Sequence, residues 1–199
     1  MIQESDLIVY PYEELRDKAA LYISKQRLVF EYPRDGYGVY NEGHILNIKN
    51  GYLGEFAFLE FVISKFKSEF GNDKDFWDKV KKKYIFSYNP VVGNYDKGFE
   101  FLINEKSVDI KMYGTKNVSR EQIFNGLEKG GRPLNLLIDV EQGAKADVYV
   151  QTFILDNSDI CLAGYYVGVP PVETWMPKPA HCCPITDLEP MNNFFDKVC

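Results

Sequence analysis

One stretch of the sequence constrains the fold more than any other: residues 99–112, FEFLINEKSVDIKM. Apolar and polar residues alternate on both sides of the turn-forming residues 104–106, which is typical of two antiparallel strands joined by a hairpin. The second strand has an apolar face formed by three alternate residues, Val108, Ile110 and Met112. Asp109 and Lys111 must then share the opposite face, because successive side chains of a strand alternate.

Two opposite charges in the middle of an apolar strand have two explanations. In the first, the strand lies at a solvated edge, where the ion pair of Asp109 and Lys111 contributes less than about 1 kcal/mol. In the second, Asp109 binds a metal ion, and the Lys111 ammonium contacts a phosphate or a nucleophilic water. The surrounding acidic residues favour the second explanation.

The rest of the chain contains helical and strand patterns in turn. Helices are expected at residues 12–26, 52–70, 73–83, 119–128 and 191–198. Further strands are expected at residues 146–155 and 160–167. Residues 32–50 should form an irregular loop, and the proline-rich residues 170–190 should wrap the surface. This order predicts a single α/β domain, with a small mixed central β-sheet flanked by helices. Its expected parts are an N-terminal helix and loop (1–50), a core (51–168), and a C-terminal wrap with a short helix (169–199).

Two more carboxylates accompany the hairpin. Asp96 precedes Asp109 with twelve residues between them and enters the first strand, so strand pairing would bring both to one end of the sheet. Glu55 lies at the start of the expected helix 52–70, inside the apolar run GYLGEFAFLEF, where an acid must face water or serve a site. Three carboxylates and Lys111 supply hard oxygen ligands for Mg²⁺ or Mn²⁺ and a cation for phosphate chemistry.

Residues 51–155 resemble the PD-(D/E)XK, or restriction-endonuclease-like, nuclease superfamily. Asp109-Ile110-Lys111 matches the D/E-x-K element, Asp96 the preceding aspartate, and Glu55 the glutamate often found on the first core helix. The resemblance implies a restriction-endonuclease-like core with a further core strand after the motif, at residues 147–151. It implies that Asp96, Asp109 and Glu55 bind Mg²⁺ or Mn²⁺, and that Lys111 orients the attacking water or stabilises charge developing on phosphate. Tyr95 stands where the family name has proline.

Several alternatives remain open at the site. Glu100 points away from the apolar face of its strand and is an alternative to Asp96 as a ligand. His44 lies upstream of the acids, where cap-snatching viral endonucleases of this superfamily place a histidine ligand. Gln151 is expected to be structural rather than to contact substrate. A phosphate track, or simply a solvated face, explains four basic residues: Lys116, Arg120, Lys129 and Arg132.

The cysteines do not form a recognisable metal motif. All four lie in the last 39 residues, and a zinc site would have to combine His181, Cys182, Cys183 and Cys199. Adjacent cysteines rarely both reach one tetrahedral ion, so we expect neither zinc nor a disulfide.

The net charge of −6, from 23 basic and 29 acidic residues, argues against a protein that mainly coats nucleic acid. It is compatible with an enzyme that uses a local basic strip. The resemblance therefore predicts a Mg²⁺/Mn²⁺-dependent endonuclease whose partner is nucleic acid, DNA rather than RNA. We expect it in the cytoplasm, or the host cytoplasm if phage-encoded, because no stretch approaches the roughly 18 apolar residues of a membrane span and no signal-peptide pattern is recognised. No membrane partner is expected, and the oligomeric state, a dimer included, is open. The rival functions are a catalytically inactive nuclease fold acting in nucleic-acid binding or assembly, and an RNA endonuclease of the cap-snatching type.

Overall fold

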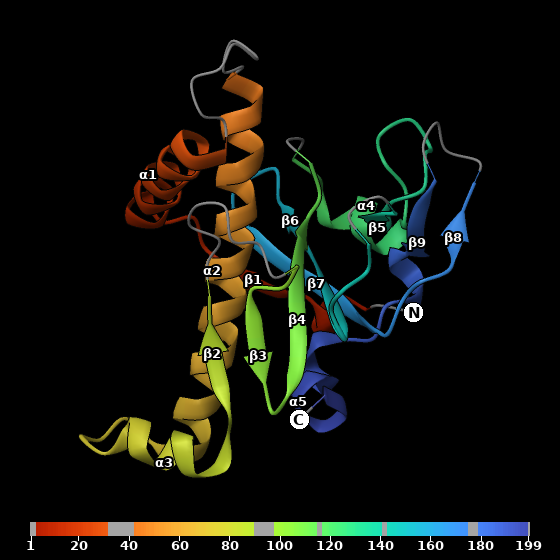
Figure 1. Ribbon diagram of the computed structural model, residues 1–199. Helices are drawn as coiled ribbons and strands as arrows, with labels where there is room; N and C mark the ends of the chain where they lie inside the picture. The colour runs from red at the N-terminus through yellow and green to blue at the C-terminus, as the bar shows by residue number, and fades with distance from the viewer. Residues whose placement is uncertain are drawn as a thin grey trace.

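A computed structural model describes residues 3–31, 42–89, 98–114, 117–140, 143–174 and 179–198 (Figure 1). Side chains are described for these residues except 15, 25–31 and 42–44. Most of the chain is organised around a mixed sheet of six strands. Their order across the sheet is β1 (Ile8–Tyr10), β7 (Ile160–Val167), β6 (Val148–Ile154), β4 (Lys106–Met112), β3 (Phe101–Ile103) and β2 (Phe86–Tyr88). Only the pairing of β4 with β6 is parallel. The expected α/β class with a mixed central sheet is confirmed.

The hairpin expected from the alternating pattern is formed by β3 and β4. Phe101 is opposite Val108, and the turn between the strands is made by Asn104 and Glu105, both with positive φ angles, 47° and 68°. Such a turn matches the right-handed twist of the strands it joins, and asparagine tolerates its first position well. Local chemistry therefore sets the register that decides which face Asp109 occupies.

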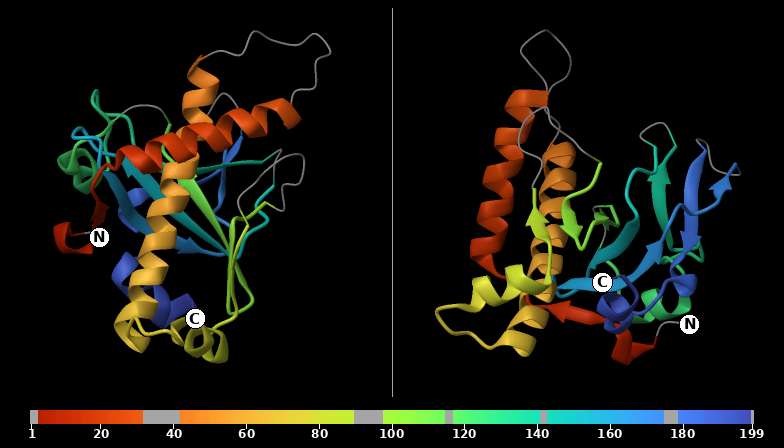
Figure 2. Two further views of the ribbon diagram at one scale, coloured as in Figure 1. Left: turned by 90° about the vertical axis from the view of Figure 1, so that its left-hand side faces the viewer. Right: turned by 60° about the horizontal axis from the view of Figure 1, so that its bottom comes forward.

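The longest helix, α2 (Glu42–Phe70), covers one face of this sheet, and α1 (Glu14–Glu31) packs on α2 (Figure 2). The expected loop over 32–50 is wrong for residues 42–50, which are helical, and Glu55 lies in the middle of the helix rather than at its start. Gly43 and Gly51 lower the intrinsic helix propensity there. Packing overrides that preference, since Ile48 packs against the main core.

A second, three-stranded antiparallel sheet lies against the opposite face of the main sheet (Figures 1 and 2). Its order is β5 (Asn135–Asp139), β9 (Ala180–Pro184) and β8 (Val172–Glu173). The expectation that residues 170–190 only wrap the surface is wrong, because this segment contributes β8 and β9. The prolines in this segment suggested irregular structure, but Pro184 lies at the end of β9, where the missing N–H of proline is tolerated.

The remaining helices are short. They are α3 (Phe76–Lys83), α4 (Arg120–Asn125) and α5 (Phe194–Val198), with 3₁₀ turns at Glu4–Asp6, Ile185–Asp187 and Met191–Asn193. Ser119 caps α4 as expected: its hydroxyl accepts from Gln122 N, and the Gln122 side chain accepts from Ser119 N. Among the described residues, no helix combines the length and apolar character that crossing a bilayer requires.

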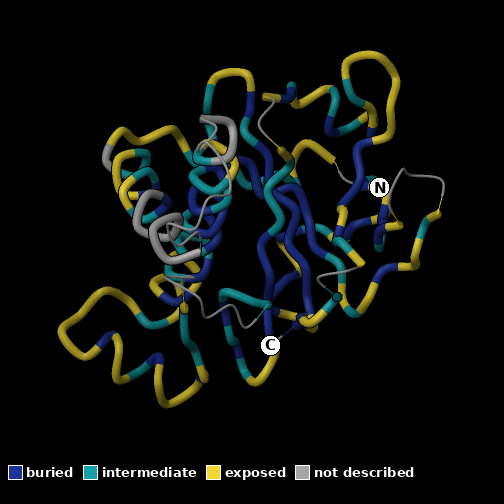
Figure 3. Tube along the Cα trace, turned by 45° about the horizontal axis from the view of Figure 1, so that its top comes forward, coloured by how far each residue is buried: buried dark blue, intermediate teal, exposed yellow. Residues whose placement is uncertain are grey.

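Two cores result, one on each face of the main sheet, and the central strands are almost wholly buried (Figure 3). The core under α2 is rich in aromatic rings, with Phe58 at 4.9 Å from Phe101 and 5.3 Å from Phe194 between ring centroids. The other core joins the main sheet to β5 and β9 through Tyr149, Phe153 and Leu136 among others. Both faces of β4 are therefore covered by protein.

Candidate functional site

The two faces of β4 carry different chemistry. Val108 and Ile110 belong to the core under α2. Asp109 and Lys111 face the other way, and across the parallel pairing with β6 they lie beside Tyr149 and Gln151. The predicted sharing of one strand face by Asp109 and Lys111 is thus present in the structure.

Asp109 and Lys111 form a buried ion pair. Lys111 Nζ lies 2.7 Å from Asp109 Oδ2, and the Asp109 side chain is 8% exposed against 29% for Lys111. The explanation of a solvated edge strand is wrong, because β4 is an interior strand and Asp109 is buried. Two charges removed from water in this way need a compensating reason, since their desolvation offsets much of their attraction.

Glu100, the residue just before β3, lies next to this pair. Its Oε2 accepts a hydrogen bond from the backbone N–H of Ile110 at 2.9 Å, so the carboxylate is held against β4. Burial raises the pKa of Glu100 well above its ordinary value, and the nearby charges of Asp109 and Glu55 raise it further. Three carboxyl groups therefore repel one another here. A bound proton or a bound cation would stabilise this set of three carboxyl groups.

Glu55 comes from α2 and is 6% exposed. Its Oε2 accepts a hydrogen bond at 2.9 Å from the hydroxyl of Tyr88, whose ring stacks on Phe101 at 4.6 Å. Burial and the Glu55 charge raise the pKa of Tyr88, which stays a neutral donor. Gly54 explains how the helix comes so close: a Cβ there would lie 2.7 Å from Thr152 Oγ1.

Lys111 keeps its positive charge in this setting. Burial lowers the pKa of its ammonium group, but Asp109, and then Glu100, outweigh that effect and leave the pKa above its ordinary value. A lysine that stays protonated does not serve as a general base near neutral pH. It can supply a fixed positive charge next to a reacting anion.

A cavity of about 400 Å³ opens beside Lys111, between the main sheet and β5. Asn135 and Leu137 of β5 line it, together with Tyr113 and Gln151. The Gln151 amide donates to the carbonyls of Lys111 and Thr152, both at 2.9 Å, at an irregularity in the pairing of β6 with β7. Gln151 thus holds the backbone of the site in place.

The other predicted residues either lie outside the described residues or are placed elsewhere in the fold. Asp96 and Lys116 lie outside the described residues, as does Cys199, and the same holds for the side chain of His44, which is placed on α2. Arg120 lies 3.7 Å from Glu4 in the N-terminal 3₁₀ turn, and Lys129 lines a different cavity. Tyr88 was not predicted, although the alternation of Phe86, Ser87 and Tyr88 could have indicated a strand.

Within residues 3–31, 42–89, 98–114, 117–140, 143–174 and 179–198, no three acidic, histidine or cysteine side chains are grouped closely enough to hold a metal ion. In that part of the chain Glu55, Glu100 and Asp109 influence one another electrostatically without forming a complete metal cage. Any complete cage would need a further ligand or a shift of these side chains.

No family model, curated protein or solved structure matches the chain. The resemblance to the PD-(D/E)XK nucleases therefore rests on the residues themselves and on their placement.

Proposed function

We propose that this protein is a metal-dependent nuclease that hydrolyses phosphodiester bonds, most simply in DNA. The observation that carries the proposal is the ion pair of Asp109 and Lys111 on a buried strand face, with Glu100 held against the same strand. A fold gains little from burying such a pair. A phosphodiesterase needs that combination of hard oxygen donors and a fixed cation.

The arrangement of elements supports a restriction-endonuclease-like core. α2, which carries Glu55, precedes three antiparallel strands, β2, β3 and β4, and the motif lies on the third of them. After α4 and β5, the chain returns to the main sheet as β6, parallel to β4, in the place where the family has its next core strand. This likeness lies in the order and pairing of the elements, so it supports the resemblance independently of the identity of the motif residues.

The donor chemistry fits Mg²⁺ or Mn²⁺ in part. Asp109 and Glu100 offer carboxylate oxygens. Burial, and then the charges of Asp109 and Glu55, raise the pKa of Glu100, and a divalent cation would relieve the repulsion between these carboxylates. In this proposal Asp109 and Glu100 would hold the ion, Asp96 would complete the set, and Glu55 would act directly or through Tyr88. When bound, the ion would polarise the phosphate and lower the pKa of a coordinated water.

Lys111 has a separate role in this proposal. Its side chain is paired with Asp109, charged and 29% exposed, and Lys111 lines the 400 Å³ cavity. From there it would stabilise the negative charge that develops on a phosphate oxygen during attack by water. Because Gln151 holds the Lys111 carbonyl, the position of this cation would depend on the β4–β6 backbone rather than on a surface loop.

The test is cleavage of plasmid, linear duplex, single-stranded DNA and RNA with Mg²⁺ or Mn²⁺. Lys111→Ala should lower turnover by about 100- to 1000-fold, while nucleic-acid affinity changes little. Lys106→Ala removes an exposed lysine from the same strand and should leave turnover unchanged. Asp109→Asn should abolish metal-dependent cleavage. Equal activity of the wild type and Lys111→Ala would remove the central claim.

The rival function of a different class is a catalytically inactive nuclease fold that acts in nucleic-acid binding or assembly. A wild type that binds nucleic acid but cuts no substrate with any divalent ion would support that rival. An RNA endonuclease of the cap-snatching type depends on His44, whose side chain lies outside the described residues, and cleavage of RNA lost in His44→Ala would support it.

A further inference from the structure

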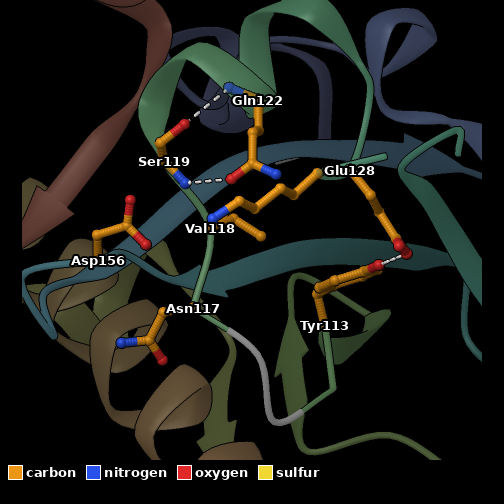
Figure 4. A pocket seen from close by; sticks show the side chains of 8 residues that line it. Tyr113, Asn117, Val118, Ser119, Gln122, Glu128 and Asp156 are labelled. Carbon is orange, nitrogen blue, oxygen red and sulfur yellow. Dashed lines mark hydrogen bonds between the residues drawn. The ribbon is translucent and has the colours of Figure 1, made fainter. Parts of the chain in front are cut away.

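A cavity of about 710 Å³ lies next to the candidate site and has a different character. Figure 4 shows Asn117 and Asp156 on one side of it and Tyr113, bonded to Glu128, on the opposite side. Tyr113 also lines the smaller cavity beside Lys111, so the two cavities meet at this ring. A volume of this size accommodates a group as large as a nucleobase with its sugar.

Tyr113 continues the line of the candidate site. Its N–H donates to Thr152 O at 2.9 Å, which extends the pairing of β4 with β6 by one residue. Tyr113 therefore points to the same side as Lys111, about 7 Å further along the strand. The ring is held by Phe153 at 5.3 Å between centroids and by the hydrogen bond of its hydroxyl to Glu128. A fixed ring of this kind is a surface on which a flat base can stack.

The polar groups of the larger cavity suit a base better than a phosphate. Among the described residues that line it, Glu128 and Asp156 contribute two carboxylates and Lys129 contributes one ammonium group, a balance that repels a second phosphate. Carboxylate oxygens accept from the exocyclic amino groups and ring N–H groups of bases. The carboxamides of Asn117 and Gln122 can each donate and accept.

We propose that this cavity receives an unpaired nucleobase next to the phosphodiester held at Lys111. The site then acts on single-stranded segments, ends or flaps, and not on intact duplex. A paired base cannot enter a cavity of this kind without first leaving its partner and its stack. This inference rests on the proposed function for its phosphate position. It adds the class of substrate.

The direction in which Asp156→Ala changes the affinity for nucleic acid tests the role of this carboxylate. Removing a carboxylate should tighten the binding of a polyanion if the residue acts only through its charge. If Asp156 accepts a hydrogen bond from a base, Asp156→Ala should weaken binding instead. The Asp156 side chain is exposed, and its backbone N–H donates to Val118 O, a bond that alanine keeps, so this substitution should not disturb the fold. Glu121→Ala is the matched control, because it removes the same charge from α4 outside the cavity lining.

The experiment measures the affinity of a short fluorescent single-stranded DNA by anisotropy, with Ca²⁺ present. A series of strands carries one abasic nucleotide at each position in turn. We expect one abasic position to weaken binding by about tenfold, and Asp156→Ala to weaken the intact strand by a similar factor. For the strand abasic at that position, Asp156→Ala should have no further effect, since the group it contacts is already gone. Asn117→Ala should behave in the same way, and the corresponding RNA strand decides which sugar is preferred.

The outcomes separate the two proposals. Tighter binding by Asp156→Ala, equal loss on intact and abasic strands, or no binding of any single strand would overturn the base pocket. None of these readouts uses cleavage. A chain that shows the predicted coupling but cuts nothing would overturn the nuclease function and leave the pocket in place. A protein that cuts duplex as well as single strands, without coupling between Asp156→Ala and the abasic position, would support the nuclease function and overturn the base pocket.

Discussion

The two faces of β4 differ in what they contribute to the protein. The face formed by Val108 and Ile110 lies in an aromatic core under α2, where burial of apolar surface stabilises the fold directly. The face formed by Asp109 and Lys111 is also covered by protein, although Lys111 is 29% exposed, and it buries charges whose desolvation offsets much of their attraction. The comparison separates side chains that hold the fold together from side chains that the fold holds in place.

The apolar face should give the largest effect on stability. Phe58 is fully buried and contacts Phe101 and Phe194. Phe58→Ala should lower the free energy of unfolding by about 3–5 kcal/mol, because it removes a large side chain and leaves a cavity. Urea unfolding measures this. Tyr22→Ala, at a position 65% exposed, is the control and should change it by about 0.5 kcal/mol or less. A loss of under about 1 kcal/mol for Phe58→Ala would mean that this core is not the main source of stability.

The close approach of α2 to the sheet gives the next effect. Gly54→Ala would place a Cβ 2.7 Å from Thr152 Oγ1 and 3.3 Å from Met112 Cε, so these side chains or the helix must shift. We expect a loss of about 1–3 kcal/mol in the free energy of unfolding.

Gly51→Ala is the matched control for this close approach. It lies in the same helix with nothing within 4 Å of the added Cβ, and should stabilise by about 0.5–1 kcal/mol. Equal effects of the two substitutions in urea unfolding would show that α2 does not rest on the sheet at Gly54.

The polar face also contains one pair that does stabilise the fold. Ser107 donates from its backbone N and its Oγ to Asp147 Oδ2, at 2.8 and 2.7 Å. These hydrogen bonds lower the pKa of Asp147. The stabilisation is therefore present above the unfolded-state pKa, near 4, and is lost as the pH falls through the lower folded-state pKa.

Asp147→Asn tests this pair. It should cost about 1 kcal/mol at pH 7, since Asp147 is exposed and its hydrogen bonds compete with water. Between pH 5 and pH 2 the variant should lose less stability than the wild type, because it lacks the group that titrates. Urea unfolding across this pH range measures both. An equal loss of stability in variant and wild type over that range would show that the hydrogen bonds to Ser107 do not favour the ionised carboxylate.

Local patterns predicted the parts of the fold that are decided locally. The β3–β4 hairpin and the Ser119 cap follow from alternation, turn residues and capping chemistry within a few positions. The short strands β1, β2, β5, β8 and β9 were not predicted, since each exists by pairing with a distant segment. The helix at residues 42–50 was missed for a related reason: its support comes from the core and not from its own propensity.

The same distinction applies to the candidate site. That Asp109 and Lys111 share a face follows from the period of a strand. That the face is buried depends on β5 and β9, which the sequence pattern did not reveal. The contact of Glu100 with the Ile110 N–H depends on how the chain enters β3. The approach of Glu55 to Tyr88 depends on how α2 lies over the sheet, which no local pattern specifies.

The smallest expected effect on stability is the most informative one. The double variant Asp109→Leu/Lys111→Met replaces the buried pair with apolar side chains of similar size. Exchanges of this kind are often neutral or stabilising, and the change also removes a charge that repels Glu100. We expect the free energy of unfolding in urea to lie within about 1 kcal/mol of the wild type, with all nuclease activity lost.

The single variants complete this cycle. Lys111→Met alone leaves the Asp109 carboxylate buried beside Glu100, and should cost about 2 kcal/mol, less than a fully buried pair because Lys111 is 29% exposed. The two substitutions should therefore be strongly non-additive. A double variant that loses as much as the sum of the singles would show that the pair holds the fold together. In that case the contrast between the two faces of β4 would not indicate function, and the proposal of a catalytic site at Asp109 and Lys111 would lose its main support.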